Sequence, residues 1–451
     1  MKLLITLKQH TPLIHFQWNQ SEVTLRASEV KPKLDRFLLT VLGNGNYEQG
    51  KKNVSLLWLV GKGHNEHYAL DYKMSIRAKG LPQEYLIASG LNTRNLSNNS
   101  NVFIISQSPY FAQEKEYEKV VTVTGETKNL PPSQREREFV EDKWQEVSKK
   151  GLLWSELDIE FFSVNDEIIK FIKENIISFF VCTNFGTCSN KGFGSFSVSK
   201  IVGEKEEKSV EYESVLAEHF NFVYSKCISD TGNKFNKQLD LIFRIIKSDY
   251  QKLKAGVNLS DKYTKSILFC YAIEKMKGHP RWEKRFFKQT LNPDKSSGLR
   301  PLGKSKLLYT KPPIADEKGT MDWKKYDCQF IRAVLGLAEQ YEFLLRDGEH
   351  RIKEKAKVKV KSSEIERFPS PLLFKVIDNK IFLVGNKIDR RILNQVFTFS
   401  YFKDKVVLKK EGKDLENSLN TPNTFDLENF IRYAMDSKQQ HHVDLGYTKK
   451  K

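Results

Sequence analysis

The stretch LDIEFFSVNDEIIKFIKENIISFFVCTNFGTCSNKGFGSFSVSKI, residues 157–201, predicts two strands around one helix. LDIEFFS at 157–163 is the first predicted strand. Asn165 then suits the N-cap of a helix to about Phe180, because apolar residues recur at helical spacing at 168, 169, 172, 176, 179 and 180. A turn-rich loop at 183–195 leads into the second strand, SFSVSKI at 195–201.

The residues before this stretch begin with a similar pattern. Residues 3–7 form a predicted strand, and the apolar spacing of 25–42 predicts a helix ended by Gly43. Residues 43–131 are rich in Gly and Asn and contain short β-type runs, NVFIIS at 101–106 and VVTVTG at 120–125.

The end of this middle region predicts a further helix. Ser133 and Glu136 form a capping box after two prolines, so we expect a helix to about Lys150. The resulting alternation of strands and helices is typical of an α+β domain of the ferredoxin or RRM type.

A second domain is expected after the charged run EKEEK at 204–208. It contains a long predicted helix from Phe235 to near Gly256, a helical stretch at 329–340, and the strands SPLLFKVI at 370–377 and KIFLVG at 380–385. Asp378 and Asn379 between these strands suit a tight hairpin turn. The prediction is therefore an α+β chain of two ferredoxin-like (RRM-like) domains with insertions, residues 1–203 and 204–451.

Composition favours a folded, basic protein. The chain has 451 residues, of which 39% are hydrophobic and 12% aromatic, enough to build hydrophobic cores. Seventy-four Lys and Arg against 56 Asp and Glu give a net charge of +18, which attracts polyanions. Nucleic acid is the leading expected partner, although solubility alone also accounts for basic proteins.

The sequence predicts a cytoplasmic protein with no metal, cofactor or membrane segment. The N-terminal apolar run from Leu3 to Leu7 is too short for a signal peptide or a membrane span. Five cysteines at irregular spacing favour reduced thiols over a disulfide framework. Cys182 and Cys188 are six residues apart, which is wider than zinc ligand pairs usually are.

The loop NKGFGSF at 190–196 is the first candidate binding site. Gly192 and Gly194 allow the backbone to approach a ligand closely, and successive amides through Ser195 are suited to cradling a phosphate. Lys191 adds a positive charge and Phe193 a ring on which a base stacks. The alternative is a tight turn in which both glycines take positive φ.

A glycine-rich loop at this place in a ferredoxin-like domain resembles the signature of the RAMP superfamily of CRISPR-associated proteins. ITLKQHTPLIHFQ at 5–17, followed by LRASEVKPKLDRFL at 25–38, resembles the opening of the first subunit of the type III-B (Cmr) assembly. QFIRAVLGL at 329–337 and ERFPSPLLFKV at 366–376 resemble two C-terminal motifs of that subunit. Four motifs in the same order are more specific than any one of them.

The sequence departs from that family at two positions. The family usually has several arginines before the Gly-Phe-Gly, where this chain has Cys188, Ser189 and Asn190. The family commonly has Lys-Gly at the start of its first helix, where this chain has Lys31 and Pro32, and proline is tolerated there if it lies in the first helical turn. Residues 43–130 match no pattern of the family.

The resemblance implies a non-catalytic subunit of a type III-B CRISPR effector complex, near the 3' region of the guide RNA and the 5' end of the target RNA. Its expected partners are guide RNA, target RNA and other Cmr-type subunits. Basic and loop residues suited to RNA contact occur in the first predicted helix, in the glycine-rich loop and in HPRWEKRFFK at 279–288. They are Arg26, Lys31, Lys33, Arg36, Lys191, Gly192, Phe193, Gly194, Ser195, Arg281 and Arg285.

Some basic residues have two interpretations. KAKVKVK at 355–361 is a strand with one basic face, which suits either RNA or the protection of a sheet edge, and we favour the edge. Lys375 has the same two interpretations. The aromatic residues of 279–288 suit base stacking or a core equally.

The main alternative function is a guide-RNA processing endoribonuclease of the same superfamily. A histidine would act as general base in such an enzyme, and His10 and His15 are the candidates. Metal-dependent cleavage requires clustered carboxylates, whereas Asp35 has only Glu29 nearby and resembles a helix ion pair. A structural protein without RNA contact is a third possibility, but it leaves the net charge and the glycine-rich loop unexplained.

Overall fold

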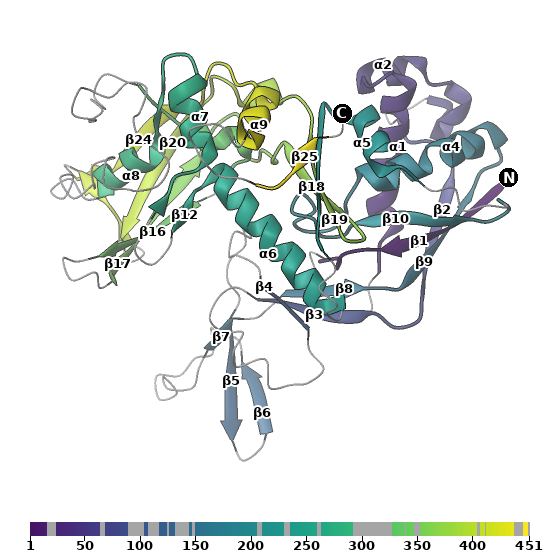
Figure 1. Cartoon of the computed structure of the whole chain (residues 1–451), viewed down its shortest axis with the longest axis horizontal. Coiled ribbons are helices and arrows are strands. Elements are labelled where there is room, and N and C mark those ends of the chain that lie inside the picture. Colours follow the sequence, from purple (N-terminus) through teal and green to yellow (C-terminus); the bar gives the residue numbers. More distant parts are fainter. Residues whose placement is uncertain are drawn as a thin grey trace. The chain divides into compact units, whose positions relative to one another are not determined.

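The computed structural model describes most of the chain (Figure 1). The described residues are 1–15, 24–63, 68–88, 103–106, 117–123, 126–130, 144–146, 149–204, 210–229, 235–258, 263–291, 327–338, 340–346, 352–403, 406–410, 412–436 and 445–449.

The chain divides into two compact units that interleave along the sequence. Unit 1 contains Met1–Val215, Ile228–Arg244 and Lys375–Asn379, and unit 2 contains Leu216–Cys227, Ile245–Phe374 and Lys380–Lys451. Residues 205–209, which include most of the charged run used to place the boundary, lie outside the described residues. The expected boundary at residues 203 and 204 stays a prediction.

Unit 1 is built on a four-stranded sheet in the order β10-β1-β9-β2. All three pairings are antiparallel. The strands are β1 (Lys2–Gln9), β2 (Lys73–Lys79), β9 (Glu156–Phe162) and β10 (Phe196–Ile201), with α1 (Ala27–Leu42) after β1 and α4 (Asp166–Cys182) after β9. This confirms the strands and helices predicted around residues 3–7, 25–42 and 157–201. The chain order is therefore β-α-β-β-α-β.

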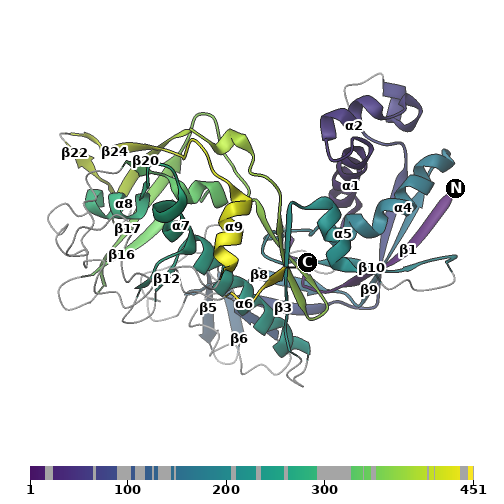
Figure 2. The same cartoon turned by 45° about the horizontal axis from the view of Figure 1, so that its top comes forward.

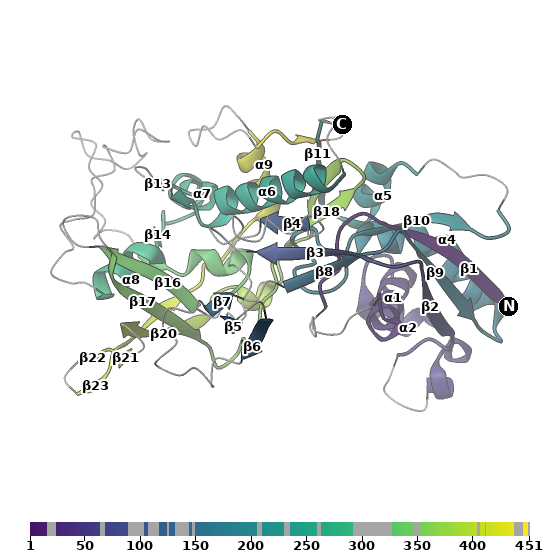
Figure 3. The same cartoon turned by 90° about the horizontal axis from the view of Figure 1, so that it is seen from below.

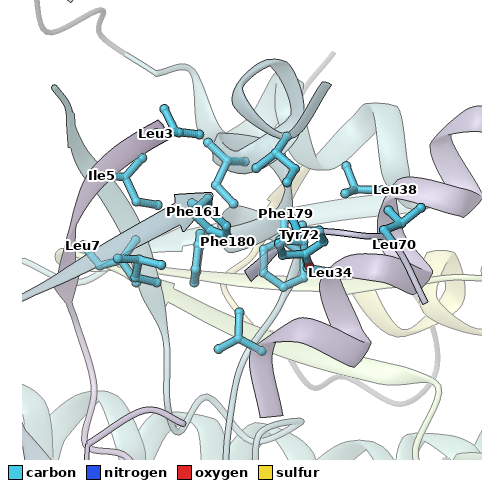
Figure 4. Packing of buried hydrophobic residues seen from close by; sticks show 14 of the residues in the cluster. Leu3, Ile5, Leu7, Leu34, Leu38, Leu70, Tyr72, Phe161, Phe179 and Phe180 are labelled. Atoms are coloured by element: carbon cyan, nitrogen blue, oxygen red, sulfur yellow. The ribbon is translucent and has the colours of Figure 1, made fainter. Parts of the chain in front are cut away.

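One face of this sheet holds the core of unit 1. Leu3, Ile5 and Leu7 alternate with more exposed residues on β1, and they pack with α1 and α4, which lie on one side of the sheet (Figure 2). Phe179 and Phe180 of α4 fill the centre of the cluster (Figure 4). Asn165 caps α4 as predicted, because its side chain accepts a hydrogen bond from the Glu167 amide.

The segment between α1 and β9 adds a helix and short strands to unit 1. The helix α2 (Tyr47–Asn53) and two 3-10 turns, Leu56–Trp58 and Val60–Gly63, precede β2. The added strands pair in the orders β4-β3-β8 and β6-β5-β7. Their bounds are β3 (Gln83–Ala88), β4 (Phe103–Ser106), β5 (Tyr117–Val123), β6 (Glu126–Leu130), β7 (Trp144–Glu146) and β8 (Lys149–Leu153).

The helix predicted from Ser133 to Lys150 is wrong where the structure describes it. Trp144–Glu146 and Lys149–Leu153 are strands, and residues 131–143 lie outside the described residues. Pairing of β8 with β3 outweighs local helix propensity here. Gly151 also allows β8 to pack closely against Pro12, because a Cβ at position 151 would lie 2.9 Å from the Pro12 Cβ.

A second four-stranded sheet has the order β18-β19-β11-β25. The chain passes through β11 (Phe222–Cys227), α6 (Phe235–Lys254), β18 (Leu372–Ile377), β19 (Lys380–Gly385), α9 (Leu427–Met435) and β25 (Thr448–Lys449). If the four strands of each sheet are numbered 1 to 4 in chain order, both sheets have the spatial order 4-1-3-2. We call the second set of strands and helices the second repeat. Asp378 between β18 and β19 takes a φ of 50°, as a tight hairpin turn requires.

Two insertions into this repeat form a further sheet. β16 (Gln340–Arg346) and β17 (Ile352–Lys361) come before β18, and β20 (Val396–Lys403), β21 (Val406–Val407) and β24 (Glu416–Asn420) come after β19. The order is β16-β17-β20-β21 (Figure 3). β24 also pairs with β20. β17 therefore lies inside the sheet, and the edge-strand interpretation of KAKVKVK is wrong.

The core beneath the inserted sheet is aromatic. Phe287 of α8 (Glu283–Leu291) packs against Phe399 and Tyr401 of β20. The helix expected at 329–340 is only a 3-10 turn, Ile331–Leu335, because Gly336 ends it at a φ of 102°.

The remaining short elements connect these parts. They are α5 (Tyr212–His219), β12 (Val257–Asn258), β13 (Tyr263–Thr264), α7 (Ile267–Lys275), β14 (Arg281–Trp282), β15 (Cys328–Gln329), the 3-10 turn Arg390–Ile392, β22 (Lys409–Lys410) and β23 (Lys413–Asp414). Among the described residues, no helix is long and apolar enough to cross a membrane.

Candidate nucleic-acid interface

A groove of about 1040 Å³ opens in unit 1 between α1, α2 and residues 68–74. Its lining combines four cations and three tyrosines with one carboxylate. These residues are Lys31, Arg36, Lys51, Lys73, Tyr47, Tyr68, Tyr72 and Asp35. Cations beside exposed aromatic rings are the combination that single-stranded nucleic acids require, because phosphates and bases are bound at once.

Arg36 and α2 form the exposed part of the groove. The Arg36 guanidinium lies 4.8 Å from the centre of the Tyr47 ring. The Lys51 ammonium lies 5.2 Å from that ring and 5.1 Å from the Tyr68 ring, and it pairs with Glu48 at 2.6 Å. The result is a strip in which cations and tyrosine rings alternate, which we call the Tyr47–Tyr68 strip: Arg36, Tyr47, Lys51 and Tyr68.

Lys31 has a structural role at the base of the groove. Its ammonium donates to the Leu70 carbonyl at 2.7 Å and to Asp35 Oδ2 at 3.0 Å, and it lies 3.9 Å from the centre of the Tyr72 ring. Burial raises the pKa of Asp35, and the Lys31 ammonium opposes that rise. Lys31 thus holds α1 against residues 70–72.

Lys33 also connects α1 to another segment. Its ammonium bonds Glu29 at 3.1 Å and the Asn184 carbonyl at 3.2 Å. Glu29 in turn accepts a hydrogen bond of 2.7 Å from the Gly186 amide. Lys33 and Glu29 therefore fix the chain just after α4, and the charge of Lys33 is largely compensated there.

Two further residues lie near the start of α1. Arg26 is the N-cap residue of α1 and is half-buried, with no capping bond from its side chain. Pro32 is the sixth residue of α1, so it lies in the second helical turn and not in the first. It is exposed and lines the groove.

The glycine-rich loop is a tight, internally bonded turn. Gly192 and Gly194 have φ values of 89° and 63°, and a Cβ on Gly194 would lie 2.0 Å from the Phe185 carbonyl oxygen. The Gly194 amide donates to the Pro12 carbonyl at 2.9 Å, and the Ser195 amide donates to Thr11 Oγ1 at 2.9 Å. The amides of Lys191 and Gly192 donate within the loop, so these four amides are not available to a phosphate in this conformation.

Phe193 and Lys191 are withdrawn from solvent. The Phe193 ring is fully buried and stacks on Phe243 of α6 with 4.0 Å between ring centres, so its face is closed to a base. The Lys191 side chain is half-buried, and burial lowers its pKa. The loop serves here as a connection between α4, β10 and α6.

The basic residues of the 279–288 segment belong to unit 2. Arg281 is half-buried on β14, while the side chain of Arg285 lies outside the described part of the chain. Trp282 and Phe287 are buried, which favours the core interpretation of these aromatics. Lys375 is also buried: its ammonium donates to three carbonyl oxygens, those of Phe180, Thr183 and Phe196, at 2.7, 3.0 and 2.9 Å.

His10 has neighbours that resemble a catalytic triad. Its Nε2 lies 2.8 Å from Ser197 Oγ, and Asp378 Oδ1 lies 3.4 Å from its Nδ1. The Asp378 amide, however, donates to Nδ1 at 3.1 Å, which leaves the proton of the neutral ring on Nε2. Burial lowers the pKa of His10, so the ring is held as a neutral donor to Ser197 and is not poised to accept its proton.

The structure also places the other catalytic candidates. His15 is half-buried, in the segment that follows the Thr-Pro-Leu turn. Asp35 pairs with Lys31 one turn earlier on α1, as a helix ion pair. Among the residues that the structure describes, no three His, Cys, Asp or Glu side chains gather as metal ligands.

The sequence pointed to Lys31 and Arg36 but missed most of the groove. Four more of its side chains, Tyr47, Lys51, Tyr68 and Lys73, all belong to residues 43–130, which match no pattern of the family. The only local signal was the proximity of Tyr47 to Lys51 in the sequence, which has helical spacing.

Family models cover nearly the whole chain. A model of the Cmr1 N-terminal domain matches residues 1–131 and 132–257, and a model of the Cmr1 C-terminal domain matches residues 263–451. Both describe the class of first subunits of type III-B CRISPR (Cmr) effector complexes. The chain belongs to the Cmr1 family.

Similar solved structures are distant in sequence. The Type III-B Cmr-beta complex bound to cognate target RNA contains a chain with 10% identity and a TM-score of 0.24, covering 44% of this chain and 59% of that one. Apo Cmr1 from Pyrococcus furiosus has 12% identity and a TM-score of 0.29, covering 56% and 75%. Cmr-beta with target RNA, AMPPnP and ssDNA has 12% identity and a TM-score of 0.28, covering 86% and 94%. No match was found among curated proteins.

Proposed function

We propose that this chain is an RNA-binding, non-catalytic subunit of a type III-B CRISPR effector complex. It acts in the cytoplasm with other Cmr-type subunits and engages the 3' region of the guide RNA and the target RNA in antiviral defence. Family membership over residues 1–257 and 263–451 supports its place in the complex. The groove in unit 1 is the observation that carries the RNA-binding part of the proposal.

The groove offers both kinds of contact that RNA requires. Arg36 and Lys73 are exposed and suited to phosphates, while Tyr68 retains 38% exposure and offers a ring to a base. None of these contacts depends on a particular base edge, which suits a subunit that must accept many guide sequences. We assign the RNA contact to the Tyr47–Tyr68 strip and Lys73, with Lys31 and Lys33 supporting α1.

The proposal extends to the architecture. Both four-stranded sheets have the β-α-β-β-α-β chain order and equivalent strand orders, and this pattern supports two ferredoxin-like frames with insertions. The remaining predicted RNA contacts stay predictions: Arg26, the loop residues Lys191 to Ser195, Arg281 and Arg285. Contacts from the loop would require its internal hydrogen bonds to open.

A charge-matched pair of variants tests the groove. In one, Arg36, Lys51 and Lys73 of the groove are each changed to Gln; in the control, the exposed Lys52, Lys170 and Lys200 of the same unit are changed to Gln. Both lose three charges. We expect the groove variant to bind a 30-nucleotide polyuridylate about tenfold or more weakly in 50 mM salt, and its salt slope to fall by about 2, since each phosphate contact contributes about 0.7. Equal affinity of the two variants would contradict the assignment.

Purification of the tagged protein from its native host tests the rest. We expect guide RNAs and other Cmr-type subunits to purify with it. The endoribonuclease alternative predicts instead that the protein alone cleaves repeat RNA and loses this activity on His15→Ala or His10→Ala. Cleavage by the isolated wild-type protein, lost in either variant, would overturn the non-catalytic proposal.

A further inference from the structure

The outer face of the inserted sheet in unit 2 carries a row of lysines that the groove does not explain. Lys357, Lys359 and Lys361 alternate along β17 with Ala356, Val358 and Val360, so the lysines share one face of the strand. Lys359 and Lys361 are exposed, and Lys357 is half-buried. We call this surface the lysine face.

The neighbouring strands extend the lysine face sideways. Lys361 is opposite Thr398, which is opposite Ser418, and Lys359 is opposite Ser400. Lys357 is opposite Phe402, whose half-buried ring lies 4.9 Å from the Lys359 ammonium. The face therefore combines ammonium groups, the hydroxyls of Thr398 and Ser418, and one aromatic ring, while Ser400 is buried between them.

The opposite face of the same sheet is closed. Ala356 and Val358 of β17 are fully buried beneath α8, together with Phe399 and Tyr401 of β20. Because the core occupies that side, the lysine face is the side of the sheet that a partner can reach.

The sheet of unit 1 provides an internal comparison. Its outer face also carries lysines, but the central strand β9 supplies carboxylates to them. Lys2 pairs with Glu160 at 2.9 Å, and Lys79 pairs with Asp158 at 2.9 Å. On the inserted sheet, Lys359 and Lys361 are opposite Ser400 and Thr398 of β20, which carry no charge, and Lys359 is opposite Gln340 of β16. Lys357 is opposite Phe402 of β20 and Glu342 of β16, so the contrast with unit 1 rests on Lys359 and Lys361. Glu416 on β24 is one strand further away and accepts a hydrogen bond from Ser400 at 2.7 Å.

The spacing of the row suits a polyanion. Alternate residues on a strand are about 6.7 Å apart, so the three lysines start from evenly spaced backbone positions along β17. Long lysine side chains on such a line reach successive phosphates of an extended strand without reading its sequence. A ring beside the line adds a place for one base to stack.

We propose that the lysine face is a second binding surface for the backbone of single-stranded RNA, separate from the groove in unit 1. This inference rests on the proposed function, because it assumes that the chain meets RNA. The surface is formed by β17 and β20, which come from two different insertions into the second repeat, so it belongs to the added sheet and not to the repeated frame.

Charge reversal on the full chain tests the lysine face. Lys357, Lys359 and Lys361 are changed to Glu together, and a matched control changes the exposed Lys277, Lys387 and Lys413 of the same unit to Glu. Both variants lose six units of positive charge. With a 30-nucleotide polyuridylate, we expect the lysine-face variant to bind about tenfold or more weakly than the control in 50 mM salt. We also expect its salt slope to be smaller by about 2.

A second variant guards against misfolding. Changing the same three lysines to Gln removes their charges without introducing carboxylates. With an unchanged melting temperature, this variant should still reduce the salt slope by about 2. If both lysine-face variants bind RNA as the control does, the inference is overturned. It is also overturned if the variants keep their RNA affinity but no longer bind an acidic protein partner, because the lysine face would then bind protein and not RNA. Failure of the wild-type chain to bind any RNA would overturn the proposed function as well, so the two failures are distinguishable.

Discussion

At the scale of single residues, Lys375 shows how a basic residue becomes structural. Its ammonium is fully buried and bonded to the carbonyls of Phe180 and Thr183, which lie at the C-terminal end of α4, and to that of Phe196. The last carbonyls of a helix lack intrahelical partners, and a cation near them is favoured by the helix dipole. Burial nevertheless lowers the pKa of Lys375 to about 7.

The depressed pKa of Lys375 predicts a pH-dependent stability. An unfolded lysine has a pKa of about 10.4, so between pH 7 and 10 the unfolded chain binds more protons and the folded state gains stability as pH rises. We expect the free energy of unfolding of the wild type to increase, relative to Lys375→Met, by about 1 to 2 kcal/mol between pH 7 and 9. Urea denaturation at both pH values measures this, with Lys200→Met as an exposed control. A constant difference would contradict it.

The crowded surroundings of Gly194 predict that adding one methyl group there lowers the unfolding free energy strongly. Gly194→Ala places a Cβ 2.0 Å from the Phe185 carbonyl oxygen at a φ of 63°, whereas Gly203→Ala has a φ of 94° and nothing within 4 Å. The control thus carries only the backbone strain, about 1 kcal/mol. We expect Gly194→Ala to cost about 3 kcal/mol or more in unfolding free energy, from urea denaturation. Equal costs would show that the loop yields to the methyl group.

At the scale of elements, α1 divides its cations between two tasks. Lys31 and Lys33 face acceptors at 2.7 to 3.2 Å and hold the helix against residues 70 and 184. Arg36 is exposed and lies over Tyr47. Lys31, Lys33 and Arg36 carry the same charge but have different surroundings. Their spacing along the helix does not reveal this difference.

This division predicts separable phenotypes within α1. Lys31→Met leaves Asp35 buried without its cation, so we expect a cost of about 2 to 3 kcal/mol in unfolding free energy from urea denaturation. Arg36→Gln should leave stability unchanged within about 0.5 kcal/mol and reduce the salt slope of polyuridylate binding by about 0.7. The assignment fails if Arg36→Gln destabilises the protein and leaves RNA affinity intact.

Elements of the frame were predictable because their signals are local. The apolar spacing of 168–180 and the Asn165 cap gave α4 nearly to its ends, and Asp378 with Asn379 gave the β18–β19 turn. The strand at 149–153 was not predictable, because its partner is β3, more than 60 residues earlier. The groove was missed for the same physical reason: Arg36, Tyr47 and Tyr68 meet only through tertiary packing.

At the scale of the whole molecule, the last strand completes the second repeat. β25 pairs with β11, where Ser225 is opposite Thr448. Near it, Lys226 donates to the Leu445 carbonyl at 2.7 Å, and its ammonium lies 3.6 Å from Oδ2 of the buried Asp249. The Leu445 carbonyl therefore helps to hold Lys226 beside Asp249, and burial raises the pKa of that carboxyl.

This closing strand predicts that truncation destabilises unit 2. A chain ending at Asp436 lacks β25, which leaves one edge of β11 unpaired, and it lacks the Leu445 carbonyl that accepts from Lys226. We expect a loss of about 2 kcal/mol or more in unfolding free energy and a lower melting temperature by calorimetry. A chain ending at Lys449 is the control and should melt as the full chain does. Equal melting of both truncations would contradict the role of β25.

The distance between β11 and its partners has a consequence for biosynthesis. β11 ends at Cys227, its neighbour β19 begins at Lys380, and its other neighbour β25 begins at Thr448. At about 5 to 20 residues per second, the ribosome needs roughly 8 to 30 s to deliver β19 and about 11 to 44 s to deliver β25. During that interval both edges of β11 lack their final partners, and unpaired strand edges of this kind are open to aggregation.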